Sequence, residues 1–217
     1  MGWIVMALLI ALVDWWALWA RRQRWDYVAK PGVMVALLLA LITGPGSAHT
    51  RWFAAGVFFS LVGDVLLMLP REQFEGGIGA FFLAHVFYIV GFRSQCRYRH
   101  PAQVLLLAIH VLIAWAVGRP VLEGVKNSGH PRLRGPVAAY MGVLVAMHFC
   151  AWLTWWHTPS VGKALAISAG ATLFLLSDTL LAWNRFVARI HQARLKVRIL
   201  YHVGQILLIG GVIGMFG

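Results

Sequence analysis

Long apolar runs separated by short polar gaps are the feature that most limits what this chain of 217 residues can fold into. A helix that crosses the hydrocarbon core of a bilayer needs about 20 mostly apolar residues, and fewer when flanking polar side chains reach the interface. Eight stretches meet this requirement, at residues 3–20, 27–43, 52–69, 78–92, 102–118, 136–156, 161–183 and 197–216. The sequence therefore predicts an all-α integral membrane protein, a single transmembrane domain over 1–217 built as a bundle of about eight helices.

The composition excludes a water-soluble fold. Hydrophobic residues make up 60% of the chain and charged residues only 12%, about half the charged fraction of a soluble domain. The net charge of +12 would suggest a nucleic-acid partner on a soluble protein. Here the cations lie in the gaps between apolar runs, which is the pattern of membrane topology. We therefore expect membrane lipid around the protein and no nucleic acid; the two cysteines are too few for a disulfide scaffold.

The distribution of lysine and arginine predicts how the bundle is oriented. Loops on the cytoplasmic side carry the excess of these cations. With the N-terminus outside, 14 of the 19 lysines and arginines fall in inner gaps and 5 in outer gaps. The prediction is an integral protein of the bacterial inner (plasma) membrane with both termini outside.

Three carboxylates, Asp14, Asp64 and Asp178, lie within apolar runs. An Asp at the centre of a membrane helix costs about 2.5–3.5 kcal/mol, so it normally faces a partner, a cavity or a reaction site. At a helical rise of about 1.5 Å per residue, all three lie about 8–9 Å from the inner ends of their helices, and His85 and His202 lie at nearly the same depth. We expect these five side chains to share one layer; for Asp14, an ion pair with Arg21 is the alternative.

Other polar side chains are predicted at the same depth. Some share a helix face, because residues three or four positions apart are neighbours on a helix. Such groups can simply hydrogen-bond neighbouring helices, but so many at one depth favour a functional cavity. The polar residues assigned to it are Lys30, His85, Tyr88, Asn184, Arg185, Tyr201, His202 and Gln205.

A weak internal repeat accompanies these residues. LVGDVLL around Asp64 is similar to LLSDTLL around Asp178, and LAHVFY around His85 is similar to LYHVGQ around His202. The separations are 114 and 117 residues. This favours two four-helix halves related as a parallel repeat, with chance similarity between leucine-rich helices as the alternative.

Two carboxylates facing each other across the bundle would provide the minimum equipment for hydrolysis through an oxocarbenium-like state. Such a pair can hold one proton between them, so that one carboxyl acts as acid and the other as base. The acid protonates the substrate and the base activates water. Lys30 and Arg185 are placed where a lipid phosphate would lie, and apolar walls would hold an acyl or alkenyl chain.

Two other functions remain open at this point. Asp64, His85, Asp178 and His202 could hold a metal for lipid hydrolysis. Intramembrane carboxylates and repeats also occur in proton-coupled transporters. The remaining histidines lack the spacing of HExxH or CxxC motifs, and no phosphate-binding glycine loop or GxSxG turn is present. We therefore expect no cofactor and no metal.

Several stretches of the sequence together form a recognisable pattern. They are Lys-Pro at 30–31, SLVGDVLLML at 60–69, GAFFLAHVFYI at 79–89, Tyr140, GATLFLLSDTLLAWNRF at 170–186 and YHVGQILL at 201–208. These stretches resemble the YhhN family, the lysoplasmalogenases. The resemblance covers residues from about 30 to 208, nearly the whole chain. It implies a membrane enzyme of about eight helices that cleaves the vinyl ether bond of lysoplasmalogens. The products would be a fatty aldehyde and glycerophosphoethanolamine or glycerophosphocholine, and the partner would be a lysophospholipid substrate.

The resemblance also implies roles for particular residues. Asp64 and Asp178 match the two membrane aspartates of the family and would be catalytic. Lys30 matches its helix-start lysine, and Asn184 and Arg185 match its Asn-Arg-Phe element, all as substrate-binding residues with Tyr140. The eighth-helix motif of the family is usually Tyr-Tyr-x-x-Gln, and here His202 replaces the second tyrosine, which leaves the substrate range open.

Overall fold

Eight long helices make up most of the computed structural model of this chain, which describes residues 2–44, 47–69, 73–97 and 99–216. The helices are α1 (Gly2–Trp19), α2 (Gln23–Thr43), α3 (Ala48–Met68), α4 (Phe74–Gly91), α5 (Ala102–Asn127), α6 (Arg134–Trp152), α7 (Val161–Phe186) and α8 (Ala193–Phe216). Short 3₁₀ turns, Pro131–Leu133 and Leu153–Trp156, flank α6. All eight helices, α6 taken with its flanking turns, are long and apolar enough to cross a membrane. The predicted eight-helix membrane fold is confirmed.

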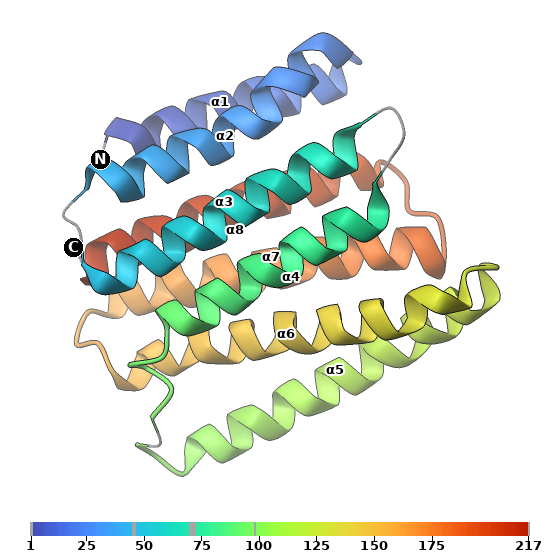
Figure 1. Cartoon of the computed structure of the whole chain (residues 1–217). Helices are drawn as coiled ribbons and strands as arrows, with labels where there is room; N and C mark the ends of the chain where they lie inside the picture. The colour runs from blue at the N-terminus through green and yellow to red at the C-terminus, as the bar shows by residue number, and fades with distance from the viewer. Residues whose placement is uncertain (1, 45–46, 70–72, 98, 217) are drawn as a thin grey trace.

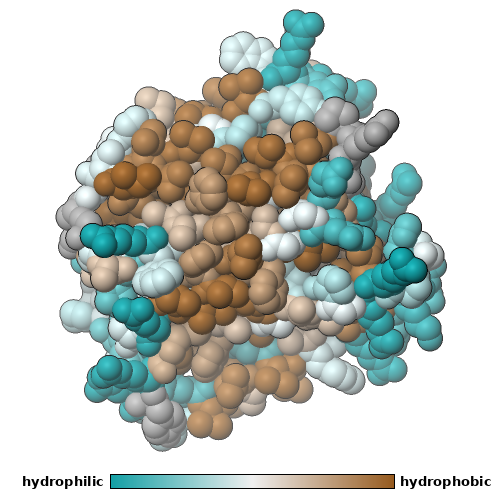
Figure 2. Space-filling view, viewed as in Figure 1, coloured by the Kyte–Doolittle hydropathy of each residue, from teal (hydrophilic) through white to brown (hydrophobic). Residues whose placement is uncertain are grey.

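The helices run roughly along one direction, and the two chain termini lie at the same end of the bundle (Figure 1). Helices α3, α4, α7 and α8 form the centre, α1 and α2 cover one side, and α5 lies at the opposite edge beyond α6 (Figure 1). Figure 2 shows apolar side chains across the middle of this face, with polar side chains gathered toward the two ends. This distribution is the one that a lipid-facing surface requires. The orientation of the termini and the relation between two halves stay predictions.

Several helix boundaries differ from the predicted ones for local reasons. Helix α5 continues through Pro120 to Asn127, although the apolar run ends at residue 118, so Arg119 and Lys126 lie on a helix and not in a gap. Helix α3 begins four residues earlier than predicted, because Ser47 and Thr50 form a capping box. The cation Arg71, counted above as an inner one, lies outside the described residues.

Helix α4 begins at Phe74, four residues before the predicted start at residue 78, and so includes Gly76 and Gly77. Glycine here serves packing and not a turn, because a Cβ at Gly77 would lie 2.6 Å from the side chain of Leu67 on α3. The two helices of the α3–α4 pair can therefore approach closely.

The pairing of α7 with α8 depends on a close backbone approach at Gly170 and Gly204. A Cβ at Gly170 would lie 2.4 Å from the backbone nitrogen of Leu208, and one at Gly204 would lie 2.9 Å from the carbonyl oxygen of Gly170. Small residues at a helix crossing bring membrane helices into van der Waals contact. This contact holds the helix that carries Asp178 against the helix that carries Tyr201.

A chain of polar contacts links α5, α6 and α7 near the middle of the bundle. His110 Nδ1 lies 2.7 Å from the carbonyl oxygen of Leu106, and its Nε2 lies 2.8 Å from His148 Nδ1. His148 Nε2 in turn lies 2.9 Å from Thr172 Oγ1. These two histidines, which the sequence analysis did not assign to any site, form an interhelical hydrogen-bond pair.

Candidate functional site

A cavity of about 340 Å³ lies between the C-terminal ends of α3 and α7 and the N-terminal halves of α4 and α8, and both predicted catalytic carboxylates line it. Asp64 reaches it from α3 and Asp178 from α7. Most of the wall is apolar, from α4 through α8. Its large apolar side chains include Phe74, Ile78, Phe81, Ile113, Val117, Val121, Met141, Leu144, Val145 and Leu181. Both aspartates therefore line one hollow, and their catalytic roles stay a prediction.

Asp64 is buried and has two close partners. Its Oδ1 lies 2.8 Å from the ammonium nitrogen of Lys30 on α2. Its Oδ2 accepts a hydrogen bond of 2.8 Å from the phenol of Tyr201 on α8. Lys30 is itself buried, with 8% of its surface exposed, so its charge is balanced by Asp64 and is not at the membrane surface.

Asp178 has a different environment although it lines the same cavity. It accepts a hydrogen bond from the phenol of Tyr140 on α6. Within the described ranges, no lysine, arginine or histidine forms an ion pair with it. Asp178 and Tyr140 are both half-buried. One carboxylate is thus paired with a cation, and the other is held by a neutral phenol.

The Asn184–Arg185 pair lies at the C-terminal end of α7, where both residues line the cavity. Asn184 Oδ1 accepts a hydrogen bond of 2.8 Å from the backbone nitrogen of Ile190 and so fixes the turn into α8. The Arg185 side chain is exposed, and its guanidinium carbon lies 3.7 Å from the centre of the Phe74 ring. This cation–π contact joins α7 to the start of α4 beside the cavity.

Four of the predicted site residues, His85, Tyr88, His202 and Gln205, are buried but are not among the residues that line the cavity. The Tyr88 hydroxyl donates to Gln205 Oε1 at 2.9 Å, and Gln205 Nε2 donates to Ser60 Oγ at 3.3 Å. These bonds join α4, α8 and α3. The ring of His85 lies against that of Tyr140, with centroids 5.5 Å apart, so His85 is one side chain away from the cavity.

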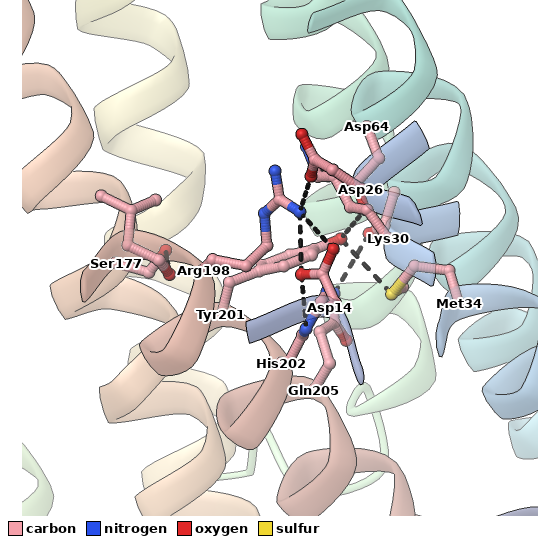
Figure 3. Close-up of polar contacts among 12 residues, drawn as sticks. Asp14, Asp26, Lys30, Met34, Asp64, Ser177, Arg198, Tyr201, His202 and Gln205 are labelled. Carbon is pink, nitrogen blue, oxygen red and sulfur yellow. Dashed lines mark hydrogen bonds and ion pairs between the residues drawn. The ribbon is translucent and has the colours of Figure 1, made fainter. Parts of the chain in front are cut away.

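A buried ionic cluster beside the cavity was missed by the sequence analysis. Arg198 Nη1 lies 2.8 Å from both carboxylate oxygens of Asp14 and 2.8 Å from Asp26 Oδ1, as Figure 3 shows. Arg194 forms an ion pair with Asp26. The partner of Asp14 is therefore Arg198 on α8, and the alternative pairing with Arg21 is wrong. His202 lies on this side, 3.7 Å from Asp14.

Helix spacing contains a signal that could have identified the cluster. Asp26 and Lys30 are four residues apart, and so are Arg194 and Arg198, so each pair lies on one helix face. Arg198 is also three residues before Tyr201. In the sequence analysis, Arg194 and Arg198 counted only as loop charges that set topology. The polar stripe that these charged residues extend along α2 and α8 into the bundle was therefore not predicted.

The metal-site alternative needs His85 and His202 beside the two carboxylates. In the described part of the chain, no group of three His, Cys, Asp or Glu side chains is arranged to hold a metal ion. His202 stacks on Trp15, with centroids 6.5 Å apart, and lies next to Asp14. The four residues are thus divided between the cavity, the layer behind it and the ionic cluster.

Arg198→Leu is expected to lower the free energy of unfolding by about 3–5 kcal/mol, because it leaves the buried carboxylates of Asp14 and Asp26 without their shared cation. Arg119→Leu is the matched control, since the Arg119–Glu123 pair has exposed side chains and should contribute less than about 1 kcal/mol. Thermal unfolding of both variants in the same detergent measures the difference. Equal melting temperatures would contradict a structural role for the cluster.

Comparison with known proteins identifies a family and several relatives of this chain. The sequence pattern of the YhhN family matches residues 25–212. The chain is 28% identical over 190 residues to the uncharacterized membrane protein YhhN of Escherichia coli O157:H7. The aligned segment covers 86% of each of the two chains. It is 33% identical over 167 residues to lysoplasmalogenase TMEM86B of Homo sapiens. This aligned segment covers 77% of the present chain and 66% of the human protein.

A bacterial lysoplasmalogenase, from Mycobacterium tuberculosis, is 27% identical over 184 residues, covering 84% of this chain and 68% of the relative. No solved structure matches the chain. The matched segment contains α2 from its first turn, all of α3 to α7 and most of α8, and therefore every residue that lines the cavity. Since the family pattern covers most of the sequence, this chain belongs to the YhhN family.

Proposed function

We propose that this protein hydrolyses the vinyl ether bond of lysoplasmalogens to a fatty aldehyde and glycerophosphoethanolamine or glycerophosphocholine. The observation that carries this proposal is that Asp64 and Asp178 line one mostly apolar cavity but have unlike partners. Relatives named lysoplasmalogenase support it. The proposed substrate is an amphiphile, which matches a hollow with apolar walls and charged groups at its inner end.

The unlike partners divide the roles of acid and base. Asp64 faces the Lys30 ammonium at 2.8 Å, so it acts as the ionised carboxylate and base. Asp178 has a phenol as its hydrogen-bond partner and no cation in ion-pair contact among the residues described, so it carries the proton and acts as the acid. A pair of carboxyl groups in environments that favour opposite protonation states is the arrangement that acid–base catalysis needs.

The reaction begins when Asp178 delivers its proton to the vinyl carbon that does not bear oxygen, leaving an oxocarbenium ion. Water attacks the carbon that bears oxygen and gives its proton to Asp64, which produces a hemiacetal. The bond from that carbon to the glycerol oxygen then breaks. The glycerol oxygen takes the proton from Asp64, Asp178 takes the hemiacetal proton, and both side chains return to their starting states.

The rim of the cavity is suited to a lipid phosphate. Arg185 and Arg194 line the cavity, and both have exposed side chains, at the C-terminal end of α7 and the N-terminal end of α8. Arginine binds phosphate oxygens with paired hydrogen bonds. We assign phosphate contact to these two residues. Lys30 is assigned instead to keeping Asp64 ionised, because it is buried against that carboxylate, whereas the two arginine side chains are exposed.

The test compares three lysophospholipids with the same chain length and headgroup, linked as 1-alkenyl ether, 1-alkyl ether or 1-acyl ester. The purified protein should release aldehyde from the alkenyl lipid, while leaving the alkyl and acyl lipids intact, because only the vinyl carbon can accept the proton. Release of fatty acid from the acyl lipid would contradict the proposal. Lipid movement across proteoliposomes without any product would favour the transporter, and loss of activity with chelator that a metal restores would favour the metal hydrolase.

A further inference from the structure

The two cysteines of the chain lie together at the opposite end of the bundle from the candidate site. Cys96 is in the segment that connects α4 to α5, and Cys150 is near the end of α6, ten residues after Tyr140. Their sulfur atoms are 2.9 Å apart although the residues are 54 positions apart in the sequence. The sequence holds no other cysteine, so any disulfide within the chain must use this pair.

The described residues of the connecting segment, on both sides of position 98, make several hydrogen bonds. Gln103 is buried, and its Oε1 accepts from the backbone nitrogens of Arg99 and His100 at 2.6 and 3.2 Å. Cys96 Sγ also lies 3.5 Å from the carbonyl oxygen of Phe92, in the turn that ends α4. Cys150 is fixed because it lies within a helix. Cys96 is thus bonded to the end of α4, and Cys150 lies within α6.

The two thiols differ in their exposure to solvent. Cys96 is exposed, whereas Cys150 is buried. Hydrogen bonding to Cys150 lowers the pKa of the Cys96 thiol, because the bond stabilises the thiolate that attacks disulfides. An exposed thiol of lowered pKa beside a buried second thiol is the arrangement in which one cysteine reacts first and the other resolves the product.

We propose that Cys96 and Cys150 form a reversible disulfide that ties the segment between α4 and α5 to α6. The Cys96 thiolate attacks a small disulfide oxidant, such as oxidised glutathione, and releases one thiol of that oxidant. The Cys150 sulfur then attacks Cys96 in the mixed disulfide and expels the second thiol. Two protein thiols become one disulfide, the oxidant is reduced to two thiols, and the cysteine protons pass to the two departing sulfurs.

The predicted topology places this pair on the outer side of the membrane, where disulfides persist. The proposal concerns helix α5, which lies at the edge of the bundle (Figure 1). The His110–His148 pair is a hydrogen-bonded contact between α5 and α6, and α5 contributes Ile113, Val117 and Val121 to the cavity wall. A bond from Cys96 to Cys150 encloses all of α5 in one covalent loop and so limits its separation from α6. This inference is independent of the proposed hydrolysis.

The first test measures the intact mass of the full-length protein after its native membranes are treated with oxidised glutathione. The wild type should become lighter by two hydrogen atoms and should return to its original mass with reductant. Cys150→Ser should instead gain one glutathione on Cys96, while Cys96→Ser should stay unmodified because its remaining thiol is buried. Two free thiols in the treated wild type, or a glutathione on each of them, would overturn the proposal.

The second test is thermal unfolding of the oxidised and the reduced wild type in the same detergent. A disulfide that closes a loop of this length should raise the melting temperature by about 5–10 °C. Neither single serine variant should show a difference between oxidising and reducing conditions. Identical melting of the oxidised and reduced wild type would overturn the bracing role, even if the bond forms.

Discussion

Replacing Asp178 by Asn is expected to slow vinyl ether hydrolysis by about 10²- to 10⁴-fold, the usual contribution of a general acid. The amide can still accept the hydrogen bond of Tyr140, but it has no proton of suitable acidity to give to carbon. Because the described residues place no cation against Asp178, the variant should melt within a few degrees of the wild type. Aldehyde release from a 1-alkenyl lysolipid measures the loss.

Two variants make this result specific. Glu123→Gln removes an exposed carboxylate on α5 and should keep full activity. Tyr140→Phe removes the hydrogen bond to Asp178 but leaves the acid in place, so it should reduce turnover much less than Asp178→Asn does. An Asp178→Asn protein that keeps more than about a tenth of wild-type turnover would remove Asp178 from the acid role.

Replacing Asp64 by Asn is expected to affect both activity and stability. Turnover should fall by about 10²- to 10⁴-fold, because the water then lacks its base. The free energy of unfolding should also fall by about 3–5 kcal/mol, because the buried Lys30 ammonium loses its counter-charge. Aldehyde release and thermal unfolding, measured on the same preparation, report the two effects.

The double variant Asp64→Asn with Lys30→Met separates these two effects. It removes the buried charge pair as a unit, so most of the lost stability should return. Turnover should not return, since the carboxylate that accepts the proton is still absent. A double variant with wild-type turnover would show that Asp64 serves only to neutralise Lys30.

The sequence was sufficient to predict the helices and the common depth of the two carboxylates, because both depend on distance along the chain. The length of each apolar run sets how many times the chain crosses the bilayer. Helical rise sets depth, and Asp64 and Asp178 lie at equal depth on helices of the same direction. Both side chains line the cavity as that argument requires.

Depth alone does not specify which neighbouring helix a side chain faces. Tyr88 and Gln205 have the predicted depth, but they bond to each other on a face that does not reach the cavity. His202 follows Tyr201 directly, and one step along a helix is enough to direct it toward Asp14 while Tyr201 reaches Asp64. Which neighbouring helix each of these side chains contacts depends on tertiary packing, and the hydropathy of the sequence does not specify it.

The partners of charged residues near helix ends were the other feature that the sequence did not predict. Arg198 begins an apolar run, and a cation at that position commonly marks topology. Only the position of Asp14 and Asp26 beside it, from helices more than 170 residues away in the sequence, makes it a buried partner. No local pattern reports a contact at that separation.

Hydrolysis of a 1-alkenyl lysolipid in deuterated water enriched in ¹⁸O tests most directly whether a proton is delivered to carbon and water then attacks the resulting cation. The account predicts one deuterium on the aldehyde carbon next to the carbonyl, and a glycerophospho product that contains no ¹⁸O. Incorporation of ¹⁸O into the glycerol hydroxyl, or aldehyde without deuterium at that carbon, would contradict it.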